Sequence, residues 1–299
     1  MSNDVELPAA LLAAAEAFSF SEANLIAAPR IEQYFGPWAV EEIQFQAAVN
    51  VLKRIDIRAH VADSLASSTN RQPPRAARRT YSMAGSTAIV PLSGALMKAE
   101  SSLNLSTSTV FARRQVRQAA ADEGVAGILL VIDSAGGTTA GTSDLAADVA
   151  RAAKSKPVLA YCEDLCAAAA YWIASQATKV FANATAIVGS IGSFMVIEDS
   201  SQRAENEGVK VHVIRAGKFK GAGCPGTPID EEFLENWQSI IDNLNEHFLR
   251  AVAAGRGLSP EAVRELADGR AHLAATAQAK RLIDGVKTID EVLAMFPKK

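Results

Sequence analysis

Residues 162–193, CEDLCAAAAYWIASQATKVFANATAIVGSIGS, decide the fold of this chain. The stretch predicts a short apolar strand that ends at Glu163 and Asp164, a helix that begins in a run of alanines, and a second strand followed by a glycine-rich turn. In α/β proteins the junction between a strand and a helix commonly carries a reactive side chain. Here that junction consists of four alanines, residues 167–170, which have no reactive group.

Strands and helices alternate along most of the chain outside this stretch. Residues 125–132, VAGILLVI, form a continuous apolar run, which is typical of a strand buried on both faces. Such alternation predicts an α/β fold with a mostly parallel sheet and helical crossovers. Further strands are expected at residues 86–93, 157–161, 179–182, 186–188 and 209–215, and helices at residues 106–122, 143–154, 166–177 and 231–254.

Composition divides the chain into three parts. Residues 1–62 are predicted to form a helical N-terminal extension, with one amphipathic helix over residues 38–57. Residues 63–85 are predicted to be a flexible basic linker, because Ser, Pro and Arg replace apolar residues there. Residues 86–299 form the main domain, which ends in C-terminal helices; one of these is expected to begin with Ser259 as N-cap and Pro260 behind it.

The overall composition is that of an ordinary globular protein. The 299 residues are 49% hydrophobic, and the net charge of −3 gives no electrostatic reason to expect nucleic acid or a membrane surface as partner. A sparse, odd set of three cysteines favours a reducing compartment and disfavours a zinc site. Because we find no segment with the length of a membrane span or the features of a signal peptide, we expect a cytoplasmic protein without membrane anchor, metal or cofactor.

The turn after the buried strand, IDSAGG at residues 132–137, is the first candidate for chemistry. Its adjacent glycines, Gly136 and Gly137, allow the backbone to adopt positive φ and to approach a ligand closely. The dinucleotide-binding and phosphate-loop glycine patterns are both missing. An oxyanion hole is the better functional interpretation, and a plain tight turn explains the motif at least as well.

The second candidate is a lysine in residues 217–221, GKFKG. A lysine at the edge of a cleft can act as a general base when desolvation lowers its pKa from about 10.4 toward neutrality. Most lysines are solvated surface groups, and the pattern does not select Lys220 over Lys218. No histidine lies in a recognisable catalytic motif, which disfavours a Ser-His-Asp triad.

Together these segments resemble the signal peptide peptidase A family of serine–lysine peptidases, above all the phage and prophage members that process capsid and scaffold proteins. The resemblance covers roughly residues 86–290 and implies the fold of the Clp protease–crotonase superfamily. It rests on elements that occur in the family's order: D-S-A-G-G at 133–137, A-A-A-A-Y-W-I-A-S at 167–175, G-S-I-G at 189–192, a G-x-x-K step at 217–220 and D-G-R…L-I-D at 268–284.

The resemblance implies a role for individual residues. Lys220 corresponds to the general base and Ser190 to the serine that helps to orient it. The backbone N–H of Gly136 or Gly137 contributes to the oxyanion hole. The family's nucleophilic serine falls at Ala168, and loss of a nucleophile typically removes on the order of a million-fold in rate.

Two explanations for Ala168 compete. One is a deliberate inactivating substitution, made to stop self-cleavage or to trap a peptide, and the other is a natural pseudoenzyme. The first is favoured because Lys220, Ser190 and the glycine turn are retained. Cys166 is not expected to replace the nucleophile, since its side chain should project in another direction. A smaller departure is Ala135, where the family often has proline.

The expected function is that of a serine endopeptidase with a Ser–Lys dyad, which hydrolyses peptide bonds through an acyl-enzyme. Capsid or scaffold proteins, or signal-peptide-like peptides, are the implied substrates, bound as extended strands. The implied state is a homo-oligomer in the host cytoplasm or, if phage-encoded, in the procapsid interior. The rival interpretations are a non-catalytic assembly or scaffold-binding protein of the same fold and a crotonase-type acyl-CoA enzyme.

Overall fold

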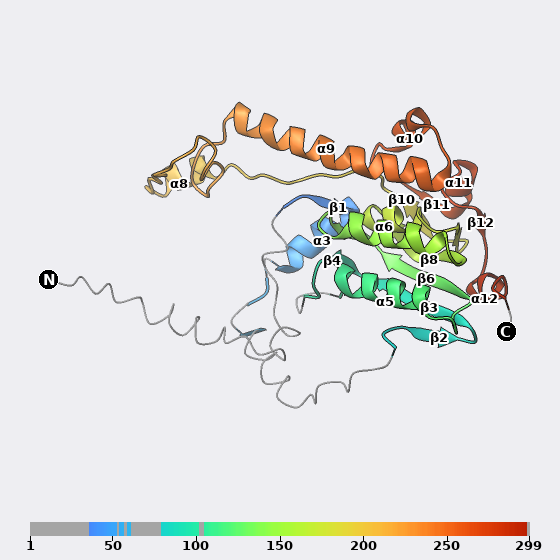
Figure 1. Ribbon diagram of the computed structural model, residues 1–299. Coiled ribbons are helices and arrows are strands. Elements are labelled where there is room, and N and C mark those ends of the chain that lie inside the picture. Colours follow the sequence, from blue (N-terminus) through green and yellow to red (C-terminus); the bar gives the residue numbers. More distant parts are fainter. Residues whose placement is uncertain (1–35, 53, 57–58, 61–78, 102–104, 298–299) are drawn as a thin grey trace.

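The computed structural model describes residues 36–52, 54–56, 59–60, 79–101 and 105–297. In these stretches the strands form two sheets, with helices packed on them (Figure 1). The larger sheet contains β2 (Ser82–Ala84), β3 (Thr87–Ser93), β6 (Gly127–Ser134), β8 (Val158–Ala167), β9 (Lys179–Ala182), β10 (Ile187–Gly189), β11 (Ala271–Leu273) and β12 (Gly285–Val286). The smaller sheet contains β1 (Trp38–Val40), β4 (Ala95–Met97), β5 (Ser106–Ser108) and β7 (Gly136–Thr138).

Three parallel strands form the centre of the larger sheet. β6 pairs with β3 on one side and with β8 on the other, and all three run in the same direction. Most of the side chains of β6 are buried, which explains the apolar run in the sequence. Parallel neighbours need crossover connections, and α5 (Thr109–Ala121) and α6 (Thr142–Ala153) lie in these connections. The predicted α/β fold class is confirmed.

Strand β8 changes partner along its length. Its first half pairs with β9, and its last residues, 165–167, pair with β10. Both partners are parallel to β8, so their carboxyl ends point the same way. The register sets Ala167 opposite Gly189. As a result, the alanine run and the G-S-I-G turn, which are separated by some twenty residues in the sequence, meet at one edge of the sheet.

Helices α9 (Glu231–Arg256), α10 (Pro260–Leu266) and α11 (Ala274–Ala279) lie above the sheet in Figure 1, where α9 runs across the top of the domain, and α9 packs on α7 (Ala169–Ala174). No helix in the described residues is both long and apolar enough to cross a lipid bilayer. Ser259 caps α10 by accepting the N–H of Ala262, with Pro260 directly behind it, as predicted. The remaining helices are α3 (Glu42–Leu52), α8 (Ser201–Asn206) and α12 (Ile289–Leu293).

The N-terminal part differs from the predicted helix over residues 38–57. Residues 38–40 form strand β1, and α3 begins only at Glu42. The helix starts there because the Glu41 side chain accepts the N–H of Gln44 at 2.9 Å, as an N-cap does. The predicted helices of residues 1–35 lie outside the described residues. Strand β2 lies inside the predicted linker and pairs with β3, so residues 82–84 belong to the larger sheet.

Two further predictions were wrong in detail. Residues 209–215 alternate in hydropathy like a strand, but they pair with no strand in the described part of the chain. Alternating hydropathy shows only that an extended segment would have one apolar and one polar face. To form a strand, the segment also needs a neighbouring strand that satisfies its backbone hydrogen bonds. The helix predicted from residue 166 starts at Ala169, because Cys166 and Ala167 pair with β10 and complete β8.

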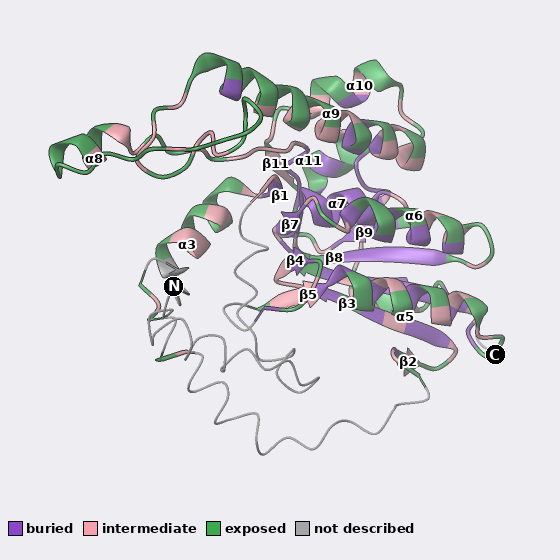
Figure 2. Ribbon diagram, turned by 60° about the vertical axis from the view of Figure 1, so that its left-hand side comes forward, coloured by how far each residue is buried: buried purple, intermediate pink, exposed green. Residues whose placement is uncertain are grey.

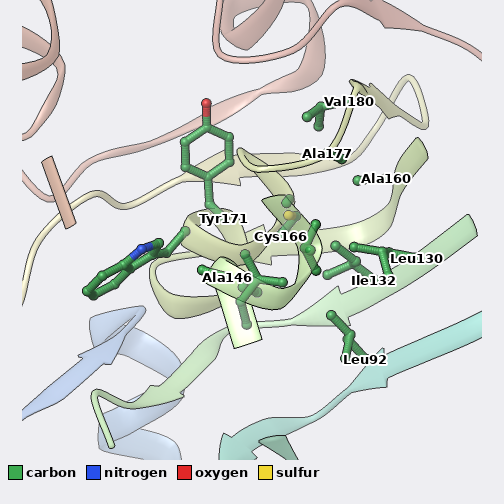
Figure 3. Packing of buried hydrophobic residues seen from close by; sticks show 14 of the residues in the cluster. Leu92, Leu130, Ile132, Ala146, Ala160, Cys166, Tyr171, Ala177 and Val180 are labelled. Atoms are coloured by element: carbon green, nitrogen blue, oxygen red, sulfur yellow. The ribbon is translucent and has the colours of Figure 1, made fainter. Parts of the chain in front are cut away.

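The alanines of the decisive stretch allow α7 to pack closely on its neighbours. All side chains from residue 166 to residue 175 are buried, and Figure 3 shows two of them, Cys166 and Tyr171, among other side chains of the core. The Tyr171 hydroxyl donates to the Leu282 carbonyl at 2.8 Å, and Trp172 stacks on Phe248 with ring centroids 4.8 Å apart. Tyr171 and Trp172 are therefore packing residues of the core.

The C-terminal end of α9 is fixed to the domain by a close approach and an ion pair. A Cβ atom added to Gly255 would lie 2.1 Å from the Ser175 carbonyl oxygen, so α9 and the end of α7 meet backbone to backbone. Next to it, Arg256 pairs with Asp284 at 2.8 Å, and Asp284 also accepts the N–H of Val180 at 2.8 Å. The last residue of the D-G-R…L-I-D element therefore joins α9 to the sheet.

A buried carboxylate joins α5 to α6. The Asp148 side chain is 1% exposed and accepts hydrogen bonds from Arg113, Arg117 and Arg151 at 2.9, 2.8 and 2.6 Å. Burial raises the pKa of Asp148, but the three guanidinium groups outweigh it, so the pKa lies below its ordinary value. A carboxylate with a depressed pKa stabilises the folded state above its unfolded pKa of about 4, and this stabilisation is lost as the pH falls through the folded value.

We expect Asp148→Asn to lower the free energy of unfolding at pH 7 by about 2 kcal/mol, because three guanidinium groups lose their shared carboxylate. Asp144→Asn is the matched control: this carboxylate is 64% exposed and pairs with Arg113, so its loss should cost less than about 0.5 kcal/mol. Urea unfolding between pH 7 and pH 2 measures both variants. The deficit of Asp148→Asn should shrink toward pH 2, and a deficit independent of pH would contradict the electrostatic explanation.

Candidate active site

Ala168 has a backbone conformation that is rare for a residue with a side chain. Its φ and ψ are 49° and −115°. Among the described residues, Ala168, Ser190 and Arg281 are the non-glycine residues with positive φ. Because β8 ends at Ala167 and α7 begins at Ala169, Ala168 forms a sharp turn between strand and helix. Such strain persists where the surroundings enforce it, and a strand–turn–helix junction of this kind carries the nucleophile in some hydrolase folds.

Hydrogen bonds to neighbouring turns hold Ala168 in place. Its N–H donates to the Gly189 carbonyl at 2.8 Å, and its carbonyl accepts the N–H of Trp172 at 2.8 Å. Ser190, the residue after Gly189, has a φ of 51°, and its N–H donates to the Arg270 carbonyl at 3.0 Å. The structure thus brings two of the predicted site residues, Ala168 and Ser190, together at the carboxyl ends of β8 and β10.

The predicted glycine turn, Gly136 and Gly137, lies against the start of α7. A Cβ atom on Gly136 would stand 2.9 Å from the amide nitrogen of Ala169, and its φ is 99°, so the position requires glycine. The N–H of Gly136 donates to Ser134 Oγ at 3.1 Å. The turn is therefore close enough to Ala168 to contribute to an oxyanion hole, although Ser134 engages the Gly136 N–H in this conformation.

The cluster is closed to solvent. Ala168 is fully buried and Ser190 is 2% exposed. Strand β1 pairs antiparallel with β7 and thereby lies along the glycine turn. A largely apolar cavity of 660 Å³ opens beside β1, between α3 on one side and β4 and residues 133–136 on the other. Its lining includes Gly136 but not Ala168.

Lys220 is not part of this cluster. It belongs to the arm, which we define as residues 195–230, and which extends from the N-terminal end of α9 away from the domain (Figure 1). The Lys220 side chain is exposed, and no hydrogen bond or ion pair between described residues joins it to Ala168 or Ser190. The structure therefore gathers Ala168, Ser190 and the glycine turn and leaves the predicted general base apart from them.

The arm is built largely from contacts within itself. The N–H of Gly226 donates to Ser200 Oγ at 2.8 Å, and Lys218 forms an ion pair with Glu232 at the start of α9. This pairing engages Lys218, whereas the described residues offer Lys220 no ion pair. Most of the arm is exposed, in contrast to the buried centre of the domain (Figure 2). The exposed side chains include several large apolar ones: Val196, Val209, Val211, Ile214 and Phe219.

Cys166 is buried beside Cys162, and its thiol is unreactive. Burial raises the pKa of the Cys166 thiol well above its ordinary value, and the hydrogen bond with Cys162 raises it further. A thiol that stays protonated and has no solvent access is a poor nucleophile. This agrees with the expectation that Cys166 does not take the place of the nucleophile.

Two contributors to the site were not predicted from the sequence. Ser134 holds the glycine turn by accepting the Gly136 N–H and by donating to the Gly94 carbonyl at 2.6 Å. Its position inside D-S-A-G-G was a usable signal. Phe194 exchanges two backbone hydrogen bonds with Trp38, each of 2.9 Å. The sequence carried no signal for this second contact, because the two residues are more than a hundred positions apart.

Comparison with known proteins adds the family to this geometry. The model of "Peptidase family S49" matches residues 150–299, which is half of the chain. The chain belongs to peptidase family S49. The matched part contains Ala168, Ser190 and Lys220, and the two sheets are consistent with the Clp protease-like fold of S49 peptidases. The family identification made from the sequence motifs is thus confirmed.

Two of the three relatives that follow, the lambda and Salmonella proteins, are similar to this chain over more residues than the S49 family model matches. "Capsid assembly protease C" of Escherichia phage lambda is 34% identical over 205 residues, 67% of this chain and 46% of the relative. "Head-tail preconnector protein GP5" of Enterobacteria phage P21 is 35% identical over 148 residues, 50% of this chain and 30% of the relative. "Protease 4" of Salmonella typhi is 27% identical over 212 residues, 70% of this chain and 34% of the relative. The chain spans less than half the length of each of these relatives.

The strain at Ala168 can be tested by glycine substitution. Ala168→Gly should change the free energy of unfolding by less than about 0.5 kcal/mol, because relief of the positive φ offsets the lost methyl group and the freer unfolded chain. Ala170→Gly, at an equally buried position inside α7, should cost about 2 kcal/mol, because it relieves no strain. Urea unfolding of the two variants gives the comparison, and equal losses would show that position 168 is not strained.

Proposed function

We propose that this protein is an S49 serine endopeptidase whose nucleophile position, 168, is occupied by alanine. The observation that carries the proposal is the strained strand–turn–helix junction at Ala168. Alanine gains nothing from a positive φ at a fully buried junction. A serine in its place would direct a hydroxyl toward the region where the glycine turn and the first amides of α7 converge.

The reaction follows from serine at position 168. The serine Oγ attacks the carbonyl carbon of a peptide bond, while the Lys220 amine accepts the hydroxyl proton and passes it to the leaving amine. Ser190 helps to orient the lysine. The N–H groups of the glycine turn and of Ala169 stabilise the oxyanion. Water then hydrolyses the acyl-enzyme and releases the second product.

The proposal treats alanine at position 168 as an inactivating substitution of an otherwise intact site. In its favour, Ser190 keeps its own strained backbone, Gly136 keeps a close approach that excludes any side chain, and Lys220 is retained. The alternative is a natural non-catalytic assembly or scaffold-binding protein of the same fold. Restoring the serine hydroxyl at position 168 distinguishes the two, because a protein that has lost other parts of its catalytic site will not regain activity from this single substitution.

Polypeptides are the proposed substrates, with capsid or scaffold proteins as the favoured class. The names of two phage relatives support this choice, since the lambda protein is called a capsid assembly protease and the P21 protein a head-tail preconnector protein. An extended peptide fits the strand edge of the glycine turn, where main-chain groups can pair with it. The apolar lining of the neighbouring cavity favours small or apolar side chains near the cleaved bond.

We propose further that the dyad forms between two copies of the chain in a homo-oligomer. In one copy the arm, whose residues include Lys220, extends away from the domain, whose strand β8 ends directly before Ala168 (Figure 1). The exposed apolar side chains of the arm, and residues 209–215, which pair with no strand in the part of the chain that the structure describes, are suited to contact a neighbouring molecule. An arm that docks on the next copy would bring Lys220 to the second molecule's position 168.

Ala168→Ser should turn an inactive protein into a peptidase. We expect cleavage of casein or of a candidate capsid scaffold to rise by on the order of a million-fold toward that of a normal serine enzyme. The matched control Ala168→Ser/Lys220→Ala should return to the background of the unchanged chain. Cleavage is followed by gel and mass spectrometry. If the serine-restored protein cuts neither these substrates nor itself, the non-catalytic alternative is correct.

Mixing two inactive chains tests the shared dyad. The Ala168→Ser/Lys220→Ala chain supplies the serine, and the unchanged chain supplies the lysine. If copies share their active sites, a mixture of the two, dissociated and reassembled together, should cleave casein, while each chain alone stays inactive. A mixture as inactive as its components, although the Ala168→Ser chain is active, would mean that serine and lysine come from one molecule.

A further inference from the structure

Strand β1 lies in a slot between two extended segments of the domain. On one side, its register with β7 pairs Ala39 with Gly137. On the other side, the N–H and carbonyl of Trp38 bond the carbonyl and N–H of Phe194, each at 2.9 Å. One residue after the strand, the N–H of Glu41 donates to the carbonyl that precedes Gly136, at 2.8 Å. A short segment held by main-chain bonds on both edges is the arrangement of a bound peptide.

The register places the carbonyl of Ala39 at the candidate oxyanion hole. Successive residues of an antiparallel strand direct their polar groups to opposite sides. Because Trp38 faces Phe194, the N–H and C=O of Ala39 face Gly137. The Ala39 oxygen also lies 2.3 Å from the point where a Cβ on Gly136 would stand, and the Ala169 nitrogen lies 2.9 Å from the same point. The Ala39 carbonyl therefore sits among the amides that a substrate carbonyl would use.

The same strand closes the site. Ala39 and Ala168 are both fully buried and belong to one apolar cluster. The Trp38 ring packs edge-on against Phe45 of α3, and Phe45 packs in turn against Phe194, with centroids 5.4 and 5.1 Å apart. In this conformation a foreign peptide has no access to position 168, because the chain's own backbone lies along the glycine turn.

The attachment of this segment to the domain is slight outside the strand. None of the side chains described in residues 41–50 is buried, and Ile43 is 75% exposed. The three residues of β1 thus provide most of the buried contact, so withdrawal of one short strand would open the groove.

We propose that β1 is an internal peptide of this chain that occupies the substrate groove, with Ala39 in the position of the residue that precedes the cleaved bond. The inference rests on the proposed function, and it adds that the groove accepts another peptide when β1 leaves it. The occupant has the chemistry that the groove selects: an extended segment with a small residue at the oxyanion hole, an aromatic side chain before it and a branched apolar side chain after it.

Peptide binding tests the inference without any catalysis. The probe is a fluorescein-labelled peptide of residues 36–43, GPWAVEEI, added to the full chain with Ala168 in place. Ala39→Pro removes the N–H that faces β7 and should release β1, so this variant should bind the probe at least tenfold more tightly than the unchanged chain. Glu42→Pro is the matched control, because proline is tolerated at the first position of α3, and it should bind like the unchanged chain.

Circular dichroism and hydrogen exchange at β6 verify that each variant keeps the fold. If Ala39→Pro does not fold, Trp38→Ala takes its place, because it removes the ring contacts to Phe45. Equal binding to the released variant and the unchanged chain, or no binding to the released variant, overturns the inference. In the Ala168→Ser background, Ala39→Pro should raise kcat/KM for an added peptide at least tenfold, and an active enzyme without this rise also overturns it. If both serine-restored proteins are inactive, the proposed function fails, and the binding result still decides the occupancy of the groove.

Discussion

The backbone hydrogen bond from Ala168 to Gly189 is the constraint on which the site depends. It ties the end of β8 to the end of β10 and forces a residue with a side chain into a positive φ. The next turn, at Ser190, is held in its own positive φ by the Arg270 carbonyl, which belongs to the D-G-R element. Three sequence motifs that are far apart along the chain are thus parts of one backbone arrangement, and each motif restricts the geometry of the next.

The sequence predicted the elements whose cause is local. Buried strands such as residues 179–182 follow from apolar runs, and the start of α10 follows from Ser259 and Pro260. Strand β1 could not be predicted, because three residues are too few to show a period and the strand's partners are β7 and Phe194, far along the chain. Residues 209–215 show the converse error, since a correct period does not supply a partner strand.

The candidate site divides in the same way. Gly136, Gly137 and Ser190 are recognisable in the sequence because they lie in glycine-containing motifs that form tight turns. The structure brings these turns together beside Ala168. Ala168 itself looks in the sequence like one of several packing alanines, and its strained φ is visible only once β8 and β10 are paired. The position of Lys220 depends on an arm that leaves the domain, so no local pattern determines where its amine goes.

Helix α9 has a further consequence as a spacer. Its C-terminal end is clamped by Gly255 and by the Arg256–Asp284 pair, while its N-terminal end carries the arm. A 26-residue helix spans about 39 Å, and each residue advances it by about 1.5 Å and turns it by about 100°. The clamp therefore sets not only how far the arm stands from the domain but also the direction in which it points. An insertion of one residue in α9 would swing the arm around the helix axis, whereas an insertion of seven, close to two full turns, would lengthen the reach and nearly preserve its direction.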